Sequence, residues 1–273
     1  MKRFYRFNSL IIILSLMFSV VVHAQEDTAP STGPTAEDLA KQLANPVANL
    51  ISVPLQNNFD FNTGPNEGFR YNLNVQPVLP FSLNDDWNLI SRTIVPIISQ
   101  KDVLYDGDSA GGLGDIVQSF FFSPKEPTKS GLVWGVGPVL LLDTASENTL
   151  GANTWAAGPN AVFLKLSGAY TYGALVNHMW SYAGSGNDIS ASFVQPFVTY
   201  AKPNGVSYTL ASENTQSWLN DIFGGFVGVY FAKVMHFGSQ TVQLGGGPKV
   251  YYGNNPLNPD FGFRVNVIFL FPK

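Results

Sequence analysis

The sequence predicts an all-β fold: a transmembrane antiparallel up-and-down β-barrel of about 12 strands with a short N-terminal periplasmic helix. Three observations predict it: strand segments with one apolar and one polar face, an N-terminal export signal, and a composition poor in charge. The alternation is clearest in residues 261–271, because successive strand residues point to opposite faces. One face would meet lipid and the other water. The first carries Phe261, Phe263, Val265, Val267, Phe269 and Phe271, and the second carries Gly262, Arg264, Asn266, Ile268 and Leu270.

The composition limits the classes of protein to which this chain can belong. Charged residues make up 12% of its 273 residues, about half of the roughly 25% in soluble domains, so its surface is poorly suited to water. The formal net charge is −4 and no run of lysine and arginine occurs, so no nucleic acid is expected as a partner. The absence of cysteine excludes disulfides and thiolate metal sites. We expect neither a cofactor nor a metal.

Residues 1–24 have the pattern of a cleaved secretory signal peptide. Basic residues lie within the first six positions, an apolar stretch runs from Leu10 to Val22, and a small-residue cleavage site ends at Ala24. An uncleaved anchor is the alternative, but the apolar stretch is shorter than the roughly 20 residues of a spanning helix. No later segment suits such a helix either. We therefore expect localisation in the bacterial outer membrane, with strands crossing it.

Residues 25–50 are expected to form a periplasmic lead-in with a short helix. Thr35 and Asp38 form a capping box, and Pro46 ends the helical pattern. We expect the helix to be a tether resting at the mouth of the barrel, because about nine residues are too few to fill a wide lumen. A plug is the alternative. The barrel itself is expected over residues 51–273.

Twelve segments with a period of two follow residue 50. Most of them contain the roughly 9–11 residues that a tilted transmembrane strand needs. Short connections alternate with longer ones, which is typical of outer-membrane barrels, and an even strand number puts both ends of the barrel on the periplasmic side. The expected strands cover residues 51–61, 69–81, 87–98, 113–123, 131–142, 154–166, 169–182, 189–201, 206–212, 222–234, 241–251 and 261–271.

The polar faces of these strands supply the candidate lumen-lining residues. In a functional interpretation they line a passage, and three arginines set its charge preference. In a structural interpretation they form a satisfied hydrogen-bond network inside a closed barrel. The sequence does not decide between these two interpretations, since the lumen of a barrel of this size is either open or filled, depending on its loops. The candidates are Gln56, Asn58, Asp60, Arg70, Asn72, Asn74, Gln76, Arg92, Gln118, Asn177, Arg264 and Asn266.

Seven stretches of the chain resemble one protein family: residues 43–58 (LANPVANLISVPLQNN), 76–90 (QPVLPFSLNDDWNLI), 112–115 (GLGD), 121–125 (FFSPK), 134–138 (WGVGP), 171–178 (TYGALVNH) and 269–273 (FLFPK). That family consists of bacterial outer-membrane β-barrels labelled transporter or MetA-pathway phenol-degradation-like protein, and sometimes mislabelled neuromedin U. The resemblance covers nearly all of the mature chain. It implies a barrel with a transport role and carries over no catalytic or binding motif. Pro272-Lys273, after the terminal aromatic residue, departs from many outer-membrane proteins.

We expect a porin-like channel or transporter for passive passage of small molecules, with hydrophobic or aromatic compounds among the candidate solutes. Its partners would be outer-membrane lipids, these solutes and the barrel-insertion machinery. An outer-membrane lipid-acting enzyme and a structural or adhesive barrel are the alternatives. We do not expect an enzyme, because no spacing marks a serine partner for His178. The loop with Asp106 and Asp108 begins like a calcium loop but lacks its later glutamate, so a solvated turn is expected.

Overall fold

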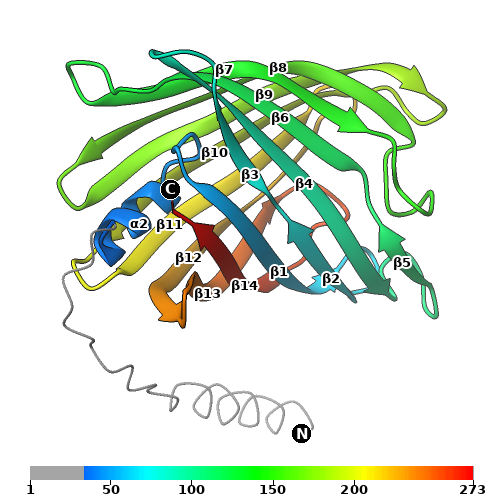
Figure 1. The fold of residues 1–273 in the computed structure, drawn as a ribbon. Coiled ribbons are helices and arrows are strands. Elements are labelled where there is room, and N and C mark those ends of the chain that lie inside the picture. Colours follow the sequence, from blue (N-terminus) through cyan, green and yellow to red (C-terminus); the bar gives the residue numbers. More distant parts are fainter. Residues whose placement is uncertain (1–33, 273) are drawn as a thin grey trace, which may run out of the picture. The chain divides into compact units, whose positions relative to one another are not determined.

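The computed structural model describes residues 34–272, which form a closed antiparallel β-barrel with one short helix before it (Figure 1). The predicted signal peptide and the first part of the lead-in lie outside the described residues. Within residues 34–272, no helix is long and apolar enough to cross a membrane. The elements are α2 (Ala36–Leu43), β1 (Ile51–Thr63), β2 (Gly68–Val75), β3 (Val78–Ser82), β4 (Trp87–Lys101), β5 (Ser109–Leu113), β6 (Ile116–Pro124), β7 (Leu132–Leu142), β8 (Thr154–Ser167), β9 (Tyr170–Gly184), β10 (Ser190–Ala201), β11 (Val206–Ser217), β12 (Ile222–Phe237), β13 (Gln240–Gly253) and β14 (Phe261–Phe271).

The fourteen strand segments make up twelve strands, as predicted. Segments β2 and β3 are two parts of one strand, because both pair with β1 and β4 and only Gln76 and Pro77 separate them. Segments β5 and β6 are likewise two parts of one strand beside β4. The first strand pairs with the last, from Ile51 with Phe271 to Phe61 with Phe261. This pairing closes the barrel and leaves no free strand edge.

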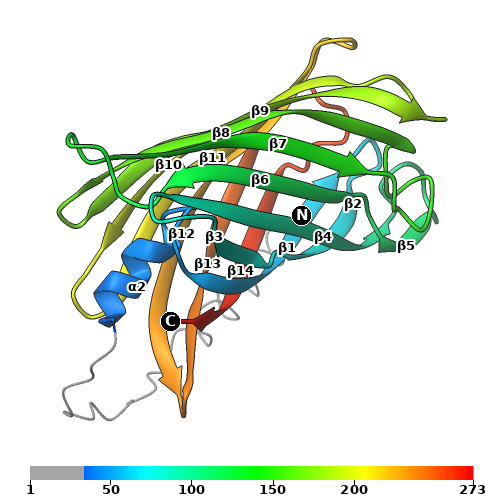
Figure 2. The same cartoon turned by 45° about the horizontal axis from the view of Figure 1, so that its top comes forward.

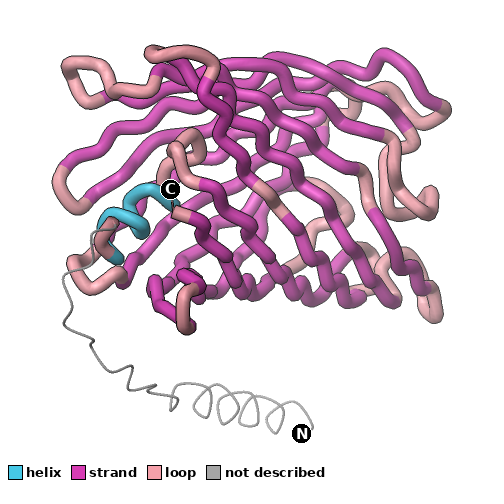
Figure 3. The backbone as a smooth tube through the Cα atoms, in the orientation of Figure 1, coloured by secondary structure: helices cyan, strands magenta, loops and turns pink. Residues whose placement is uncertain are grey.

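The connections differ in length at the two ends of the barrel (Figure 3). At the end called here the short-turn end, residues 168–169 join β8 to β9 and residues 238–239 join β12 to β13. At the opposite, long-loop end, the connections include residues 143–153 and 254–260. The start of β1 and the end of β14 both lie at the short-turn end. The connections at the long-loop end are longer on average, as predicted, although residues 125–131 at the short-turn end form a longer connection than residues 64–67 and 218–221 at the opposite end.

The barrel wall has an apolar outer face and an inner face rich in polar groups. In β14, Phe263 and Val265 are each 37% exposed, whereas Arg264 between them is 6% exposed. Aromatic rings gather on the outer face near both ends, as in barrels whose aromatic belts meet lipid headgroups. They include Phe61 with Phe69 and Phe261 at the long-loop end, and Tyr170 with Tyr200 and Trp87 with Trp134 at the short-turn end.

A one-residue bulge interrupts the alternation between β5 and β6. Ile97 of β4 pairs with Leu113, and Ile94 pairs with Val117, so three steps along β4 oppose four steps on the neighbouring strand. The extra residue lies in the Gly114-Asp115 break. Because strand side chains alternate with a period of two, one inserted residue turns every later side chain to the opposite face.

Helix α2 begins with the predicted capping box, in which the Asp38 backbone N–H donates to the Thr35 hydroxyl and the Asp38 carboxylate accepts from the Thr35 backbone. The hydrogen bonds from Thr35 lower the pKa of the Asp38 carboxyl. Figure 2 shows the helix at the short-turn end, beside β12. Its buried face consists of Leu39 and Ala40, each 1% exposed.

The segment formed by residues 36–50 spans the mouth of the barrel at the short-turn end. On one side, Leu39, Ala40 and Leu50 pack in a cluster with Ala201, Val234 and Leu270 of β10, β12 and β14. On the opposite side, Val47 packs in a second cluster with Ile90, Phe121, Val133, Val162, Leu164 and Leu175 of β4 and β6 to β9. The helix does lie at the mouth, as predicted. Residues 36–50 therefore pack against both sides of the mouth and cover it.

Neighbouring phenylalanines in β6 test the two faces of the wall. Phe121 is 0% exposed and Phe122 is 43% exposed. We expect Phe121→Ala to lower the free energy of unfolding by about 3–5 kcal/mol, the usual cost of emptying a buried aromatic site. Phe122→Ala should cost less, because detergent or lipid fills the space of the ring and only the transfer free energy of the side chain is lost. Urea titration of the refolded variants measures both values, and equal losses would contradict the assignment of faces.

Candidate functional site

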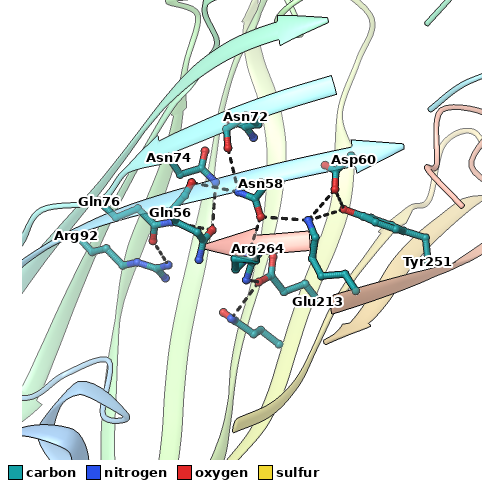
Figure 4. A network of polar contacts seen from close by, with 12 residues as sticks. Gln56, Asn58, Asp60, Asn72, Asn74, Gln76, Arg92, Glu213, Tyr251 and Arg264 are labelled. Carbon is teal, nitrogen blue, oxygen red and sulfur yellow. Dashed lines mark hydrogen bonds and ion pairs between the residues drawn. The ribbon is translucent and has the colours of Figure 1, made fainter. Parts of the chain in front are cut away.

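Twelve polar residues meet on the inner face of the barrel, between its two ends (Figure 4). They come from β1, β2, β4, β10, β11, β13 and β14 and from the break after β2. We call this set the polar belt. Its members are Gln56, Asn58, Asp60, Asn72, Asn74, Gln76, Arg92, Gln195, Glu213, Lys249, Tyr251 and Arg264.

The buried lysine of the belt is held by three polar partners. Lys249 Nζ lies 2.8 Å from Asp60 Oδ1 and donates to Asn58 Oδ1 at 3.1 Å and to the Tyr251 hydroxyl at 2.7 Å. The Tyr251 hydroxyl in turn donates to Asp60 Oδ1 at 2.7 Å. Lys249 can keep its charge at 2% exposure because the carboxylate and these oxygens replace its hydration.

An arginine and a glutamate form the second ion pair of the belt. Arg264 Nη1 lies 2.9 Å from Glu213 Oε1, and Arg264 Nε donates to Asn58 Oδ1 at 2.8 Å. The Asn58 oxygen therefore accepts hydrogen bonds from both Arg264 and Lys249. This shared acceptor joins strands β1, β13 and β14 into one network.

Three amides, those of Gln56, Asn74 and Gln76, form a chain that ends on a second arginine. Gln76 Nε2 donates to Gln56 Oε1 at 3.2 Å, and Arg92 Nη2 donates to Gln76 Oε1 at 2.8 Å. Close to the belt, Arg70 Nε donates to Gln100 Oε1 at 3.1 Å in the same way. Among residues 34–272, neither Arg92 nor Arg70 has a carboxylate within 4.0 Å.

A cavity of about 260 Å³ lies between the polar belt and the segment 36–50. Gln76, Arg92 and Arg264 contribute polar groups to its lining. Leu43 and Ala48 come from the segment and contribute an apolar part. The segment therefore covers a space that the barrel wall alone would leave open at the short-turn end.

The connection of residues 143–153 folds along the inner face near the long-loop end. Asp115, in the bulge between β5 and β6, holds it by accepting backbone hydrogen bonds at 2.6–3.2 Å from Thr144, Ala145 and Ala152. Gly112 pairs with Ile98 and shares its inner face, and a side chain at Gly112 would collide with Ser146. The loop therefore occupies part of the interior above the belt.

The structure brings together most of the predicted lumen residues. Gln56, Asn58, Asp60, Asn72, Asn74, Gln76, Arg92 and Arg264 belong to the belt, Arg70 lies beside it, and Asn266 lines the cavity. Asn177 faces inward opposite Asn160, and its side-chain oxygen has no hydrogen-bond partner within the described part of the chain.

Gln118 is the exception among these residues. It pairs with Thr93, whose hydroxyl donates to Gln118 Oε1 at 2.6 Å, while Gln118 Nε2 donates to the Ser91 hydroxyl at 3.0 Å. All three lie on the outer face, because the bulge at Gly114-Asp115 reverses the alternation. Its assignment to the lumen is therefore wrong.

The predicted lumen residues do not include Lys249, Tyr251, Glu213 or Gln195. Continuing the alternation of residues 241–251 from Gln243 would have placed Lys249 and Tyr251 on the inner face. Glu213 was missed because strand β11 extends to Ser217, beyond the predicted end at residue 212. Nothing local in the sequence marks that extension.

On the outer face near the long-loop end, His178 has a serine partner that the sequence did not reveal. His178 Nδ1 lies 2.8 Å from Ser192 Oγ, and Trp218 Nε1 donates to the same oxygen at 2.9 Å. The His178 Nε2 atom lies 3.4 Å from Ser190 Oγ. The pairing of β9 with β10, which puts Ser192 opposite His178, creates this group.

Residues 34–272 contain no group of three or more His, Cys, Asp or Glu side chains arranged to hold a metal ion. In the loop of the two aspartates, Asp108 accepts backbone hydrogen bonds from Leu104, and Asp102 accepts one from Gly107. These carboxylates stabilise the turn itself.

Comparison with protein-family models and with curated proteins finds no match. Among solved structures, an outer membrane channel from Pseudomonas putida F1 is similar with a TM-score of 0.65 and 13% identity, over 82% of this chain and 96% of that one. A NanC porin is similar with a TM-score of 0.50 and 10% identity, over 80% of this chain and 98% of that one. At these identities the likeness shows a shared β-barrel fold.

Proposed function

We propose that this protein is an outer-membrane channel for the passive passage of small molecules. The observation that carries the proposal is a closed wall with an apolar outside and a charged, hydrogen-bonded inside beside a cavity. In lipid such a wall satisfies all its backbone groups internally. The export signal and the likeness to a channel and a porin support the same location and role. Outer-membrane lipids, small solutes and the barrel-insertion machinery are its proposed partners.

Passage needs no cofactor in this proposal. A solute enters at the long-loop end, passes the loop of residues 143–153, crosses the polar belt and reaches the cavity. Amide, carboxylate and guanidinium groups of the belt replace part of its hydration, as the lining groups of selective pores do. Four cations (Arg70, Arg92, Lys249, Arg264) against two carboxylates (Asp60, Glu213) give this region a net positive charge. The segment 36–50 then limits exit at the short-turn end.

A second candidate function is lipid hydrolysis on the outer face. The hydrogen bond between His178 and Ser192 favours it, since a serine nucleophile needs an adjacent base. Within residues 34–272, no carboxylate or amide side chain hydrogen-bonds the imidazole, so the group that orients the base in a triad is not provided. An adhesive role is less favoured, because the connection of residues 143–153 folds inward.

Releasing the segment 36–50 should widen the channel. Leu39→Asp puts a charge into the apolar contact with Ala201 and Val234. Burying an unpaired carboxylate there costs more free energy than the packing of the helix contributes, so the helix should leave the mouth. We expect a several-fold rise in single-channel conductance in planar bilayers. Glu37→Gln changes charge on the partly exposed face of the same helix and should leave conductance unchanged. Unaltered conductance in Leu39→Asp would show that the segment is no barrier.

Loosening the inward loop should affect the opposite end. Asp115→Asn removes the charge that attracts three backbone N–H groups, so the loop of residues 143–153 should become mobile and the current noisier. Glu147→Gln removes the same charge from an exposed position of this loop and serves as the control. Single-channel recordings compare them. Identical traces would rule out Asp115 as the anchor.

If the protein hydrolyses lipids, an active-site reagent should label Ser192. A fluorophosphonate probe and release of fatty acid from phospholipid vesicles would detect activity in the refolded protein. Under this alternative, Ser192→Ala and His178→Ala each abolish both signals, whereas Ser212→Ala, elsewhere on the outer face, keeps them. A wild-type protein without either signal removes the alternative.

A further inference from the structure

The cavity beneath the polar belt supports an inference about the solute, which rests on the proposed channel function. We propose that this cavity binds one small organic anion. Its carboxylate lies against the Arg92 guanidinium, and its apolar part lies against Leu43, Ala48 and Phe197, all of which line the cavity.

The charge of Arg92 is the first reason for this assignment. The two carboxylates of the belt are already engaged, Asp60 with Lys249 and Glu213 with Arg264. Within the described residues, the guanidinium of Arg92 hydrogen-bonds one side chain, the neutral amide of Gln76. A guanidinium has five N–H donors and suits the two oxygens of a carboxylate. An anion in the cavity would supply the missing counter-charge.

The lining also has an apolar part. Leu43, Ala48 and Leu50 come from the segment 36–50, and Phe197 and Ile268 come from the wall. An inorganic anion such as phosphate would use the polar groups alone, whereas an organic anion would also cover these apolar side chains. The volume of about 260 Å³ lies just below the roughly 300–1,000 Å³ of common ligand pockets, so one small molecule fits. A small organic anion with one carboxylate and a compact apolar group therefore matches both the polar and the apolar part of the lining.

Calorimetric titration of the refolded mature protein in detergent tests the site. Benzoate is the probe, and benzamide has the same shape without the charge. We expect benzoate to bind at one site and benzamide to bind at least ten-fold more weakly. Arg92→Gln should weaken benzoate about 10- to 100-fold, the usual effect of removing a hydrogen bond to a charged group.

Arg70→Gln is the matched control, because Arg70 also pairs with an amide and lies beside the belt but does not line the cavity. It should bind benzoate within two-fold of the wild type. Arg92→Lys keeps the charge and should keep part of the affinity, and circular dichroism establishes that each variant is folded. Equal binding of benzoate and benzamide, or equal losses in Arg92→Gln and Arg70→Gln, would overturn the proposal.

Bilayer recordings of the same preparations separate this inference from the channel function. A barrel that conducts potassium chloride but binds no benzoate overturns the anion site and leaves the channel proposal standing. A barrel that binds benzoate through Arg92 but passes neither ions nor benzoate supports the site and overturns the channel. Benzoate that binds and reduces the ionic current in the wild type, but not in Arg92→Gln, supports both.

Discussion

The pairing of the first strand with the last is the constraint on which the rest of this structure depends. Eleven residues of β1, from Ile51 to Phe61, pair in register with β14. Closure removes the unpaired amides of a sheet edge, which would be costly in lipid. It also divides the side chains of every strand into two sets, because a closed sheet has one inside and one outside. The apolar outer face and the polar belt are consequences of that division.

The polar belt reduces the free-energy cost of the charged groups that barrel closure places in the interior. A barrel of twelve strands encloses charged groups in an interior shielded from bulk water, where an unpaired ion is costly. Asn58 reduces this cost by accepting hydrogen bonds from Lys249 and Arg264 together, while Asp60 and Glu213 supply the opposite charge. The same pairing leaves Arg92 with a neutral partner at the edge of the cavity. The network that pairs the buried ions therefore also leaves the uncompensated charge of Arg92 facing the cavity.

Both ends of the barrel are narrowed by segments that the sheet does not contain. At the short-turn end, Leu39 and Val47 anchor the segment 36–50 to opposite walls. At the long-loop end, the Asp115 carboxylate fixes residues 143–153 to the inner face. The interior is thus a belt of fixed charges between two covers that side-chain contacts hold. In the proposed channel, passage depends on how readily these two segments move.

How much the sequence revealed differed between the fold and the site. Alternation in residues 261–271 was sufficient to assign Arg264 and Asn266 to the inside, and the capping box at Thr35 was sufficient to place the helix. Gln118 was assigned to the wrong face because a bulge at Gly114-Asp115 reverses the pattern without changing local composition. Ser192 was not recognised as the partner of His178, since they meet only through the pairing of β9 with β10.

The sequence by itself determined the strand number and the two faces of most strands, because these depend on local periodicity and composition. The tertiary structure alone decided which side chains meet. Asp60 and Tyr251 are 191 positions apart, and Asn58 and Arg264 are 206 apart, yet each pair is hydrogen-bonded. Such contacts follow from strand register around a closed ring, and register is a property of pairs of strands that neither strand specifies alone.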